Sequence, residues 1–138
     1  PLQKHIECHK KNCENLNNVT LYECALSDIE TDSIMTARDY KSGMSSLLKR
    51  KFKDKYEVIV KTKKLDSFDL PKVDFIKIDV EGYEAQVLSG AKKTILKWKP
   101  KIYIEIWPKY VDTVSKILGE MGYSITKMSD LNYLAVCD

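Results

Sequence analysis

Three carboxylates stand at the ends of apolar, strand-like segments and are the residues best suited to chemistry. Asp79 and Glu81 come at and just after the end of segment 73–80 (VDFIKIDV), and Glu105 interrupts segment 101–107 (KIYIEIW). A carboxylate in such a position can accept a hydrogen bond from a hydroxyl or an ammonium, or act as a base where its pKa is raised. Burying an unpaired carboxylate is costly, so we expect Glu105 at the mouth of a site. The alternative for Asp79 is that it caps the next helix. The alternative for Glu81 is that its negative charge complements the positive N-terminal end of that helix.

Alternating helix and strand patterns predict the elements that position these carboxylates. Segment 73–80 has the near-continuous apolar run of a central parallel strand covered on both faces. Helical spacing of apolar residues runs from Val87 to Leu96, and Pro100 ends it. Periodicity and composition predict helices over 2–16 and 109–121, strands over 19–24, 33–37, 56–63, 101–107, 123–128 and 133–137, and a loop over 25–28.

This order predicts an α/β fold with a mostly parallel sheet, helices on both faces, and an antiparallel hairpin at the C-terminal end. Ligands of such sheets bind outside the carboxyl ends of the strands. Asp79, Glu81 and Glu105 are therefore expected to converge at one edge, together with Ala25-Leu26-Ser27-Asp28 after the first strand.

Size and charge limit the classes of partner. The 138 residues predict a single domain over 1–138, and a net charge of +3 gives no case for nucleic acid or an anionic membrane as partner. The basic run 48–56 is expected to be a solvated loop. No apolar run approaches the ~20 residues that span a bilayer. Four cysteines without CxxC spacing predict free thiols in a reducing compartment, and thus a cytoplasmic protein.

The residues His5, Cys8, His9 and Cys13 have side chains that bind metals. They lie on one predicted helix, with His9 and Cys13 on its apolar stripe and His5 and Cys8 pointing elsewhere. A single helix cannot wrap four ligands around one tetrahedral ion, so we expect no metal site.

An ordered set of motifs resembles the FkbM-type methyltransferases. IDVEGYE at 78–84 is followed by VLSGA at 87–91, with ALSD at 25–28 and LD at 65–66 before them, and PKIYIE at 100–105 and GY at 122–123 after them. Each motif alone is weak, but the order covers nearly the whole chain. The resemblance implies a Rossmann-like class I methyltransferase sheet and S-adenosylmethionine as cofactor.

The family's chemistry carries over to particular positions of this sequence. The resemblance implies that Ala25, Leu26, Asp28 and Asp79 contact the cofactor. It implies that Asp79, with Glu81 or Glu105, orients and deprotonates a hydroxyl of a sugar or small natural product. Many relatives carry a histidine near the position of Trp107, so a base of that type is missing there.

The family's first strand and glycine-rich loop have no counterpart in the sequence. Its ribose-binding acidic residue would stand directly before Pro1, so the chain is expected to be a fragment truncated on its N-terminal side that binds cofactor weakly alone. The alternative function is a non-catalytic Rossmann-like binding or oligomerisation module derived from a methyltransferase.

Overall fold

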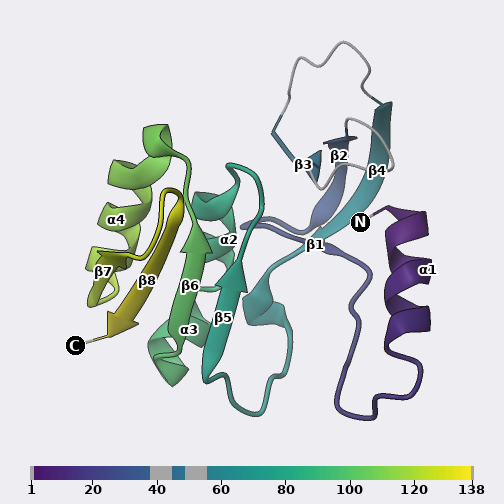
Figure 1. The fold of residues 1–138 in the computed structure, drawn as a ribbon, viewed down its shortest axis with the longest axis horizontal. Helices are drawn as coiled ribbons and strands as arrows, with labels where there is room; N and C mark the ends of the chain where they lie inside the picture. The colour runs from purple at the N-terminus through teal and green to yellow at the C-terminus, as the bar shows by residue number, and fades with distance from the viewer. Residues whose placement is uncertain (1, 38–44, 49–55, 138) are drawn as a thin grey trace.

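Two mixed β-sheets lie side by side in the computed structural model, which describes residues 2–37, 45–48 and 56–137 (Figure 1). One sheet has the strand order β1-β4-β2-β3, and the other has the order β5-β6-β8-β7. The strands of the first sheet are β1 (Ala25–Leu26), β2 (Thr31–Ala37), β3 (Ser45–Ser46) and β4 (Tyr56–Lys63). Those of the second are β5 (Phe75–Ile78), β6 (Lys101–Glu105), β7 (Tyr123–Lys127) and β8 (Asn132–Cys137).

The α/β class is confirmed, but the mostly parallel sheet is not. Among the described residues, β1 pairs with β4 and β5 pairs with β6 in parallel, whereas the other four pairings are antiparallel. The hairpin-like insertion is confirmed as the antiparallel pair of β2 and β4. The predicted C-terminal hairpin is confirmed as β7 and β8.

Helices cover one face of the second sheet rather than both, as Figure 1 shows. These helices are α2 (Glu84–Gly90), α3 (Lys92–Trp98) and α4 (Val111–Glu120), while α1 (Gln3–Asn12) lies beside the first sheet. Ile78, Ile102 and Ile104 point into the helix-covered side and are almost fully buried. Phe75 is 57% exposed, because β5 is an edge strand with one open face. The expectation of a central strand covered on both faces was therefore wrong for the described residues.

The extended segment 19–24 is not a strand, although its composition predicted one. No described strand lies beside it to complete a hydrogen-bonded ladder, and Val19 and Tyr22 remain exposed. The first strand that pairs is instead β1, which lies in segment 25–28, where a loop was expected. β-branched and aromatic composition indicates extended backbone, but a strand also needs a neighbour.

The single helix predicted from Val87 towards Pro100 is divided at Ala91 into α2 and α3. The carboxylate of Asp66 accepts hydrogen bonds from the backbone of Lys93 and Thr94 and from the Thr94 hydroxyl, each at 2.8–2.9 Å. Asp66 lies in the 3₁₀ helix η1 (Leu65–Ser67), so a distant residue caps α3. The LD motif is thereby explained structurally.

Candidate functional site

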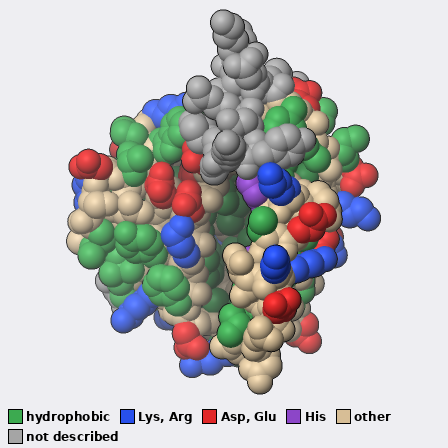
Figure 2. Space-filling model, turned by 45° about the vertical axis from the view of Figure 1, so that its right-hand side comes forward, with side chains coloured by type: hydrophobic (Ala, Val, Ile, Leu, Met, Phe, Trp, Pro, Cys, Tyr) green, Lys and Arg blue, Asp and Glu red, His purple; other side chains and the backbone are tan. Residues whose placement is uncertain are grey.

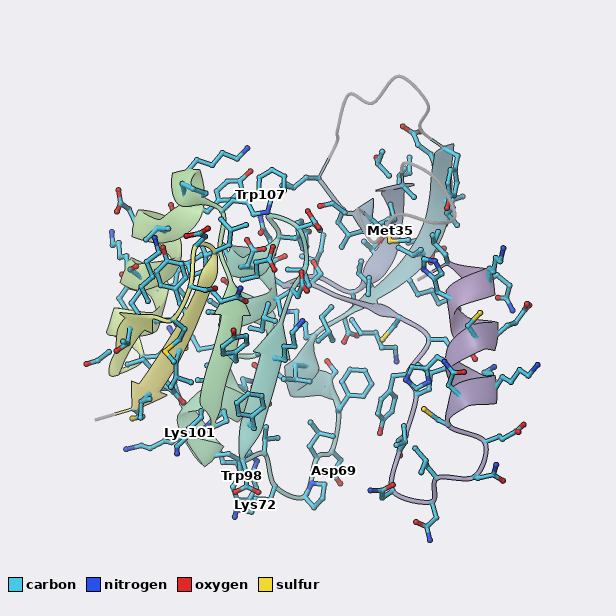
Figure 3. All side chains as sticks on the ribbon, viewed as in Figure 1. Met35, Asp69, Lys72, Trp98, Lys101 and Trp107 are labelled. Carbon is cyan, nitrogen blue, oxygen red and sulfur yellow. The ribbon has the colours of Figure 1, made fainter. Side chains whose placement is uncertain are left out.

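The carboxyl ends of β5 and β6 bring two of the predicted carboxylates to the same edge. Ile78 pairs with Ile104, so Asp79 and Glu105 occupy the next position of neighbouring parallel strands. Figure 3 shows Trp107 at this end of the sheet, whereas Trp98 and Lys101 lie at the opposite end. The expected convergence of Asp79 and Glu105 at one rim is confirmed by this register.

Lys77 links these two carboxylates electrostatically. Its ammonium donates to Asp79 Oδ2 at 2.9 Å. This hydrogen bond, with the nearby charges of Asp79 and Glu105, raises the pKa of Lys77. Both side chains of the pair are substantially exposed, so the pair contributes only ~0–1 kcal/mol to stability. The ion pair places a positive charge beside the Asp79 carboxylate.

Glu81 stands in a left-handed backbone conformation, with φ of 57°. Gly82 follows with φ of 93°, so two consecutive left-handed residues form the turn from β5 into α2. The hydroxyl of the buried Ser46 donates to the Glu81 carbonyl at 3.0 Å and fixes this turn. A non-glycine residue costs ~1–2 kcal/mol in this region, and Lys99, the C-cap of α3, has a similar φ of 48°.

The main cavity opens between the two sheets and has a volume of about 360 Å³. Figure 2 shows the surface hollowed between the two halves of the molecule. Ala25, Leu26 and Asp79, all predicted to bind cofactor, line this cavity together. Asp28, Glu81 and Glu105 are not among its lining residues, so their predicted contacts with a ligand stay predictions.

The segment Ala25-Leu26-Ser27-Asp28 is tied to the α2 region by Ser27. The buried Ser27 hydroxyl lies 3.2 Å from the Tyr83 hydroxyl and donates to Asp28 Oδ1 at 3.1 Å. A Cβ at Gly90 would stand only 1.9 Å from the Ser27 carbonyl oxygen. Gly90 therefore lets the end of α2 approach the backbone that forms one wall of the cavity.

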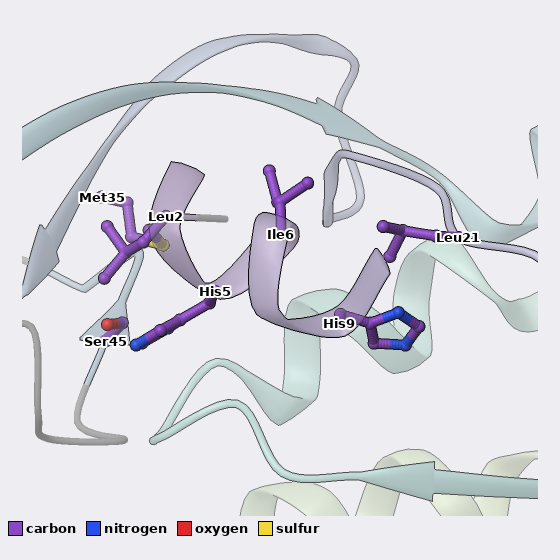
Figure 4. Close-up of a pocket in the computed structure, with 7 residues that line it drawn as sticks. All are labelled: Leu2, His5, Ile6, His9, Leu21, Met35 and Ser45. Carbon is purple, nitrogen blue, oxygen red and sulfur yellow. The ribbon is translucent and has the colours of Figure 1, made fainter. Parts of the chain in front are cut away.

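A second cavity, of about 280 Å³, lies beside α1 (Figure 4). His5 and His9 both line it, and His9 is exposed. The assignment of His9 to a core stripe, with His5 pointing elsewhere, was wrong, because α1 packs through Leu2 and Ile6. Met35 and Ser45 line both cavities, which are therefore adjacent. Within the described residues no group of three or more His, Cys, Asp and Glu side chains is placed to hold a metal ion.

Sequence reasoning missed the residues that β2 and β3 contribute to the main cavity. Met35, Ser45, Ser46 and Leu47 line it from the insertion, and Cys24, Val80 and Tyr83 complete the walls. Of these, Val80 and Tyr83 had a signal in the sequence, because they lie inside IDVEGYE. Most of the basic run 48–56, expected to be a solvated loop, lies outside the described residues.

Neither the cysteines nor the helices of the described residues alter this interpretation of the site. All four cysteines are free thiols, as expected. Burial raises the pKa of the Cys24 thiol, so this side chain at the cavity is a neutral thiol rather than a nucleophile.

No helix in the described part of the chain has the length and apolar character to cross a bilayer.

Comparison with known proteins gives a consistent family assignment. The model of the methyltransferase FkbM domain matches residues 2–125. No curated protein matches the chain. The crystal structure of methyltransferase FkbM from Methylobacillus flagellatus KT matches with a TM-score of 0.63 and 18% sequence identity. The match covers 96% of this chain and 33% of that one, so this chain spans about a third of that protein's length. At this identity the likeness concerns the fold.

Proposed function

Because a family model matches most of its length, the chain belongs to the FkbM methyltransferase domain family, and we propose that it methylates a hydroxyl group with S-adenosylmethionine as donor. The acceptor in this proposal is a sugar or another small molecule. The proposal rests on the main cavity, which is lined by Asp79 together with Ala25 and Leu26. A strand-end carboxylate facing an apolar wall suits a ligand with both an aromatic base and polar groups.

The residues of the main cavity fit this cofactor. Ala25 and Leu26 would pack against the adenine, and the Asp79 carboxylate would accept from the ammonium of the methionine moiety. The buried Ser45 hydroxyl has no hydrogen-bond partner within the described residues and lines the cavity, so it is available to a polar group of the ligand. A volume of about 360 Å³ lies within the ~300–1,000 Å³ typical of small-molecule pockets.

Asp79 also has the position to act on the acceptor. When bound, S-adenosylmethionine supplies a methyl group on a sulfonium, which is already strongly electrophilic. The protein therefore mainly orients the acceptor, and proximity alone lowers a barrier by ~7–11 kcal/mol. Lys77 donates to Asp79 Oδ2, so Oδ1 would accept from both the cofactor ammonium and the acceptor hydroxyl, and it takes the proton of the hydroxyl. Glu105, at the same rim, or Glu81 assists by orienting the acceptor.

Titration of the full-length protein with S-adenosylhomocysteine tests cofactor binding. Leu26→Trp fills the main cavity and should weaken binding by tenfold or more. Leu96→Trp makes the same change at an exposed position of α3 and should leave the affinity unchanged. Thermal unfolding of both variants checks that they are folded. Equal affinity in wild type and Leu26→Trp would refute this location of the cofactor.

A further inference from the structure

A third cavity, of about 210 Å³, lies on the other side of the turn that follows β5. Its walls come from the start of α2, from α4, from the 3₁₀ helix η2 (Pro108–Tyr110) and from Leu48. The main cavity is lined by Val80 and Tyr83, and the third cavity by Gly82 and Glu84. One four-residue turn thus separates the two cavities, and the third has no role in the cofactor site proposed above.

Glu84 is an ionisable side chain buried at the wall of this third cavity. It is only 1% exposed, and its Oε1 accepts the backbone N–H of Gly82 at 2.8 Å. Its Oε2 is buried and has no hydrogen-bond partner within the described residues. Burial raises the pKa of Glu84, although the Gly82 N–H acts in the opposite direction. Leaving a buried oxygen without a hydrogen bond lowers the stability of the fold by ~1–3 kcal/mol or more, so we expect a hydrogen-bond donor at Oε2.

Gln86 supplies a second unpaired oxygen at the same cavity. Its Oε1 is buried without a partner in the described part of the chain, and its side chain lines the cavity beside Glu84. Buried polar atoms are nearly always paired in native proteins. The two unpaired oxygens thus belong to residues of one helix that line a single cavity, and a ligand with two hydrogen-bond donors would satisfy them.

Apolar side chains form the opposite walls of the third cavity. A Cβ at Gly82 would lie 2.9 Å from Tyr110 Cε2 and 3.0 Å from Leu48 Cδ1, too close for a side chain, so Tyr110 and Leu48 pack directly against this glycine. Tyr110 and Leu48 therefore give the cavity an apolar lining beside Glu84 and Gln86, the residues that carry the two unpaired oxygens. This combination suits the carbon face and the hydroxyl edge of a saccharide ring.

We propose that the third cavity is an acceptor subsite in which Glu84 Oε2 and Gln86 Oε1 bind two hydroxyl groups of a polyhydroxylated, saccharide-like acceptor. Both oxygens act as hydrogen-bond acceptors for these hydroxyls, as an ionised carboxylate and an amide carbonyl do. The inference rests on the proposed function, because it places the remainder of the acceptor beside the turn that carries Asp79. Glu84 and Gln86 are specificity-determining residues here and take no proton from the reacting hydroxyl.

Binding of methyl α-glucopyranoside to the full-length protein, followed by NMR, tests this subsite. The sugar should shift the side-chain amide signals of Gln86 and the backbone amide of Thr113, which also lines the cavity. Tetrahydropyran, which has the ring without hydroxyls, should not. Glu84→Gln keeps the size of the side chain and an oxygen for the Gly82 N–H, and it should weaken sugar binding by about tenfold. Equal binding of both probes, or unchanged binding in Glu84→Gln, would overturn the proposal.

Two exposed positions on α4 provide a matched pair that leaves the core untouched. Thr113→Phe places a ring at the cavity and should abolish sugar binding. Lys116→Phe introduces the same ring one turn along the helix, outside the cavity lining, and should have no effect on sugar binding. Equal loss in both variants would contradict the subsite. Affinity for S-adenosylhomocysteine should be unchanged in Thr113→Phe, so failure of the cofactor proposal and failure of the subsite give different results.

Discussion

Gly90→Ala probes the close approach that joins α2 to the wall of the main cavity. The new methyl group would start 1.9 Å from the Ser27 carbonyl oxygen, 2.8 Å from the Ser27 carbonyl carbon and 3.2 Å from Asp28 Cα. The atoms in the way belong to the backbone, so no side-chain rotation relieves the clash. Real Cβ contacts essentially never fall below 3.0 Å, so α2 and segment 25–28 must separate by roughly 1.1 Å.

Separation of this size should destabilise the protein by about 1–3 kcal/mol, the usual cost of overpacking a core. Alanine is otherwise the better helix residue by ~0.5–1 kcal/mol, which offsets part of the loss. Gly119→Ala in α4 is the matched control, because its new methyl would meet no atom of the described chain within 4 Å. That variant should be more stable than wild type by ~0.5–1 kcal/mol.

Urea unfolding of the three proteins measures these differences. Hydrogen exchange at the amides of Ser27 and Ile29 would report whether segment 25–28 has moved in Gly90→Ala. Affinity for S-adenosylhomocysteine should fall in the same variant, since Ala25 and Leu26 form the cavity wall. If Gly90→Ala were as stable as Gly119→Ala, the close packing of α2 on Ser27 would be wrong.

Further predictions concern the cap of α3, a buried tyrosine and its pH dependence. Asp66→Ala removes three hydrogen bonds at the start of α3 and should cost about 1–2 kcal/mol by urea unfolding, whereas the exposed Asp69→Ala should change stability by less than ~0.5 kcal/mol. Tyr123→Phe removes the buried hydrogen bond to the Pro100 carbonyl, 2.8 Å long, and should cost about 1 kcal/mol near pH 7. Burial raises the pKa of Tyr123 from 10.0 to about 12, so its neutral form is favoured in the folded protein. Its contribution is fully present below pH 10 and is lost as the pH rises towards 12, so the difference from Tyr123→Phe should shrink over that range. A constant difference across it would contradict the burial of this phenol.

The carboxylate rim was predictable because it depends on strand ends alone. Asp79 lies at the end of one apolar segment and Glu105 lies near the end of the next, and parallel pairing of those segments places them together without knowledge of the remaining packing. The C-terminal hairpin was predictable for a similar reason, since its short link forces antiparallel pairing.

Features that depend on distant contacts were not predictable from local pattern. The strand expected over 19–24 has the right composition, but its pairing depends on a neighbour that no periodicity reveals. The break at Ala91 arises beside the Asp66 carboxylate, which comes from 25 residues earlier in the chain. Ser45 and Met35 reach both cavities through the register of β2 and β3, which the polar, basic sequence around them does not suggest.

The central claim is that Asp79 at the rim of β5 orients and deprotonates the acceptor hydroxyl. Transfer of labelled methyl from S-adenosylmethionine by Asp79→Asn tests it most directly, with Asp74→Asn as the control. Asp74 precedes the same strand at its opposite end and is exposed. We predict that Asp79→Asn lowers the rate by about 10²-fold or more, while S-adenosylhomocysteine still binds because the amide oxygen can accept from its ammonium, and that Asp74→Asn retains the full rate. Full methyl transfer by Asp79→Asn would contradict the claim.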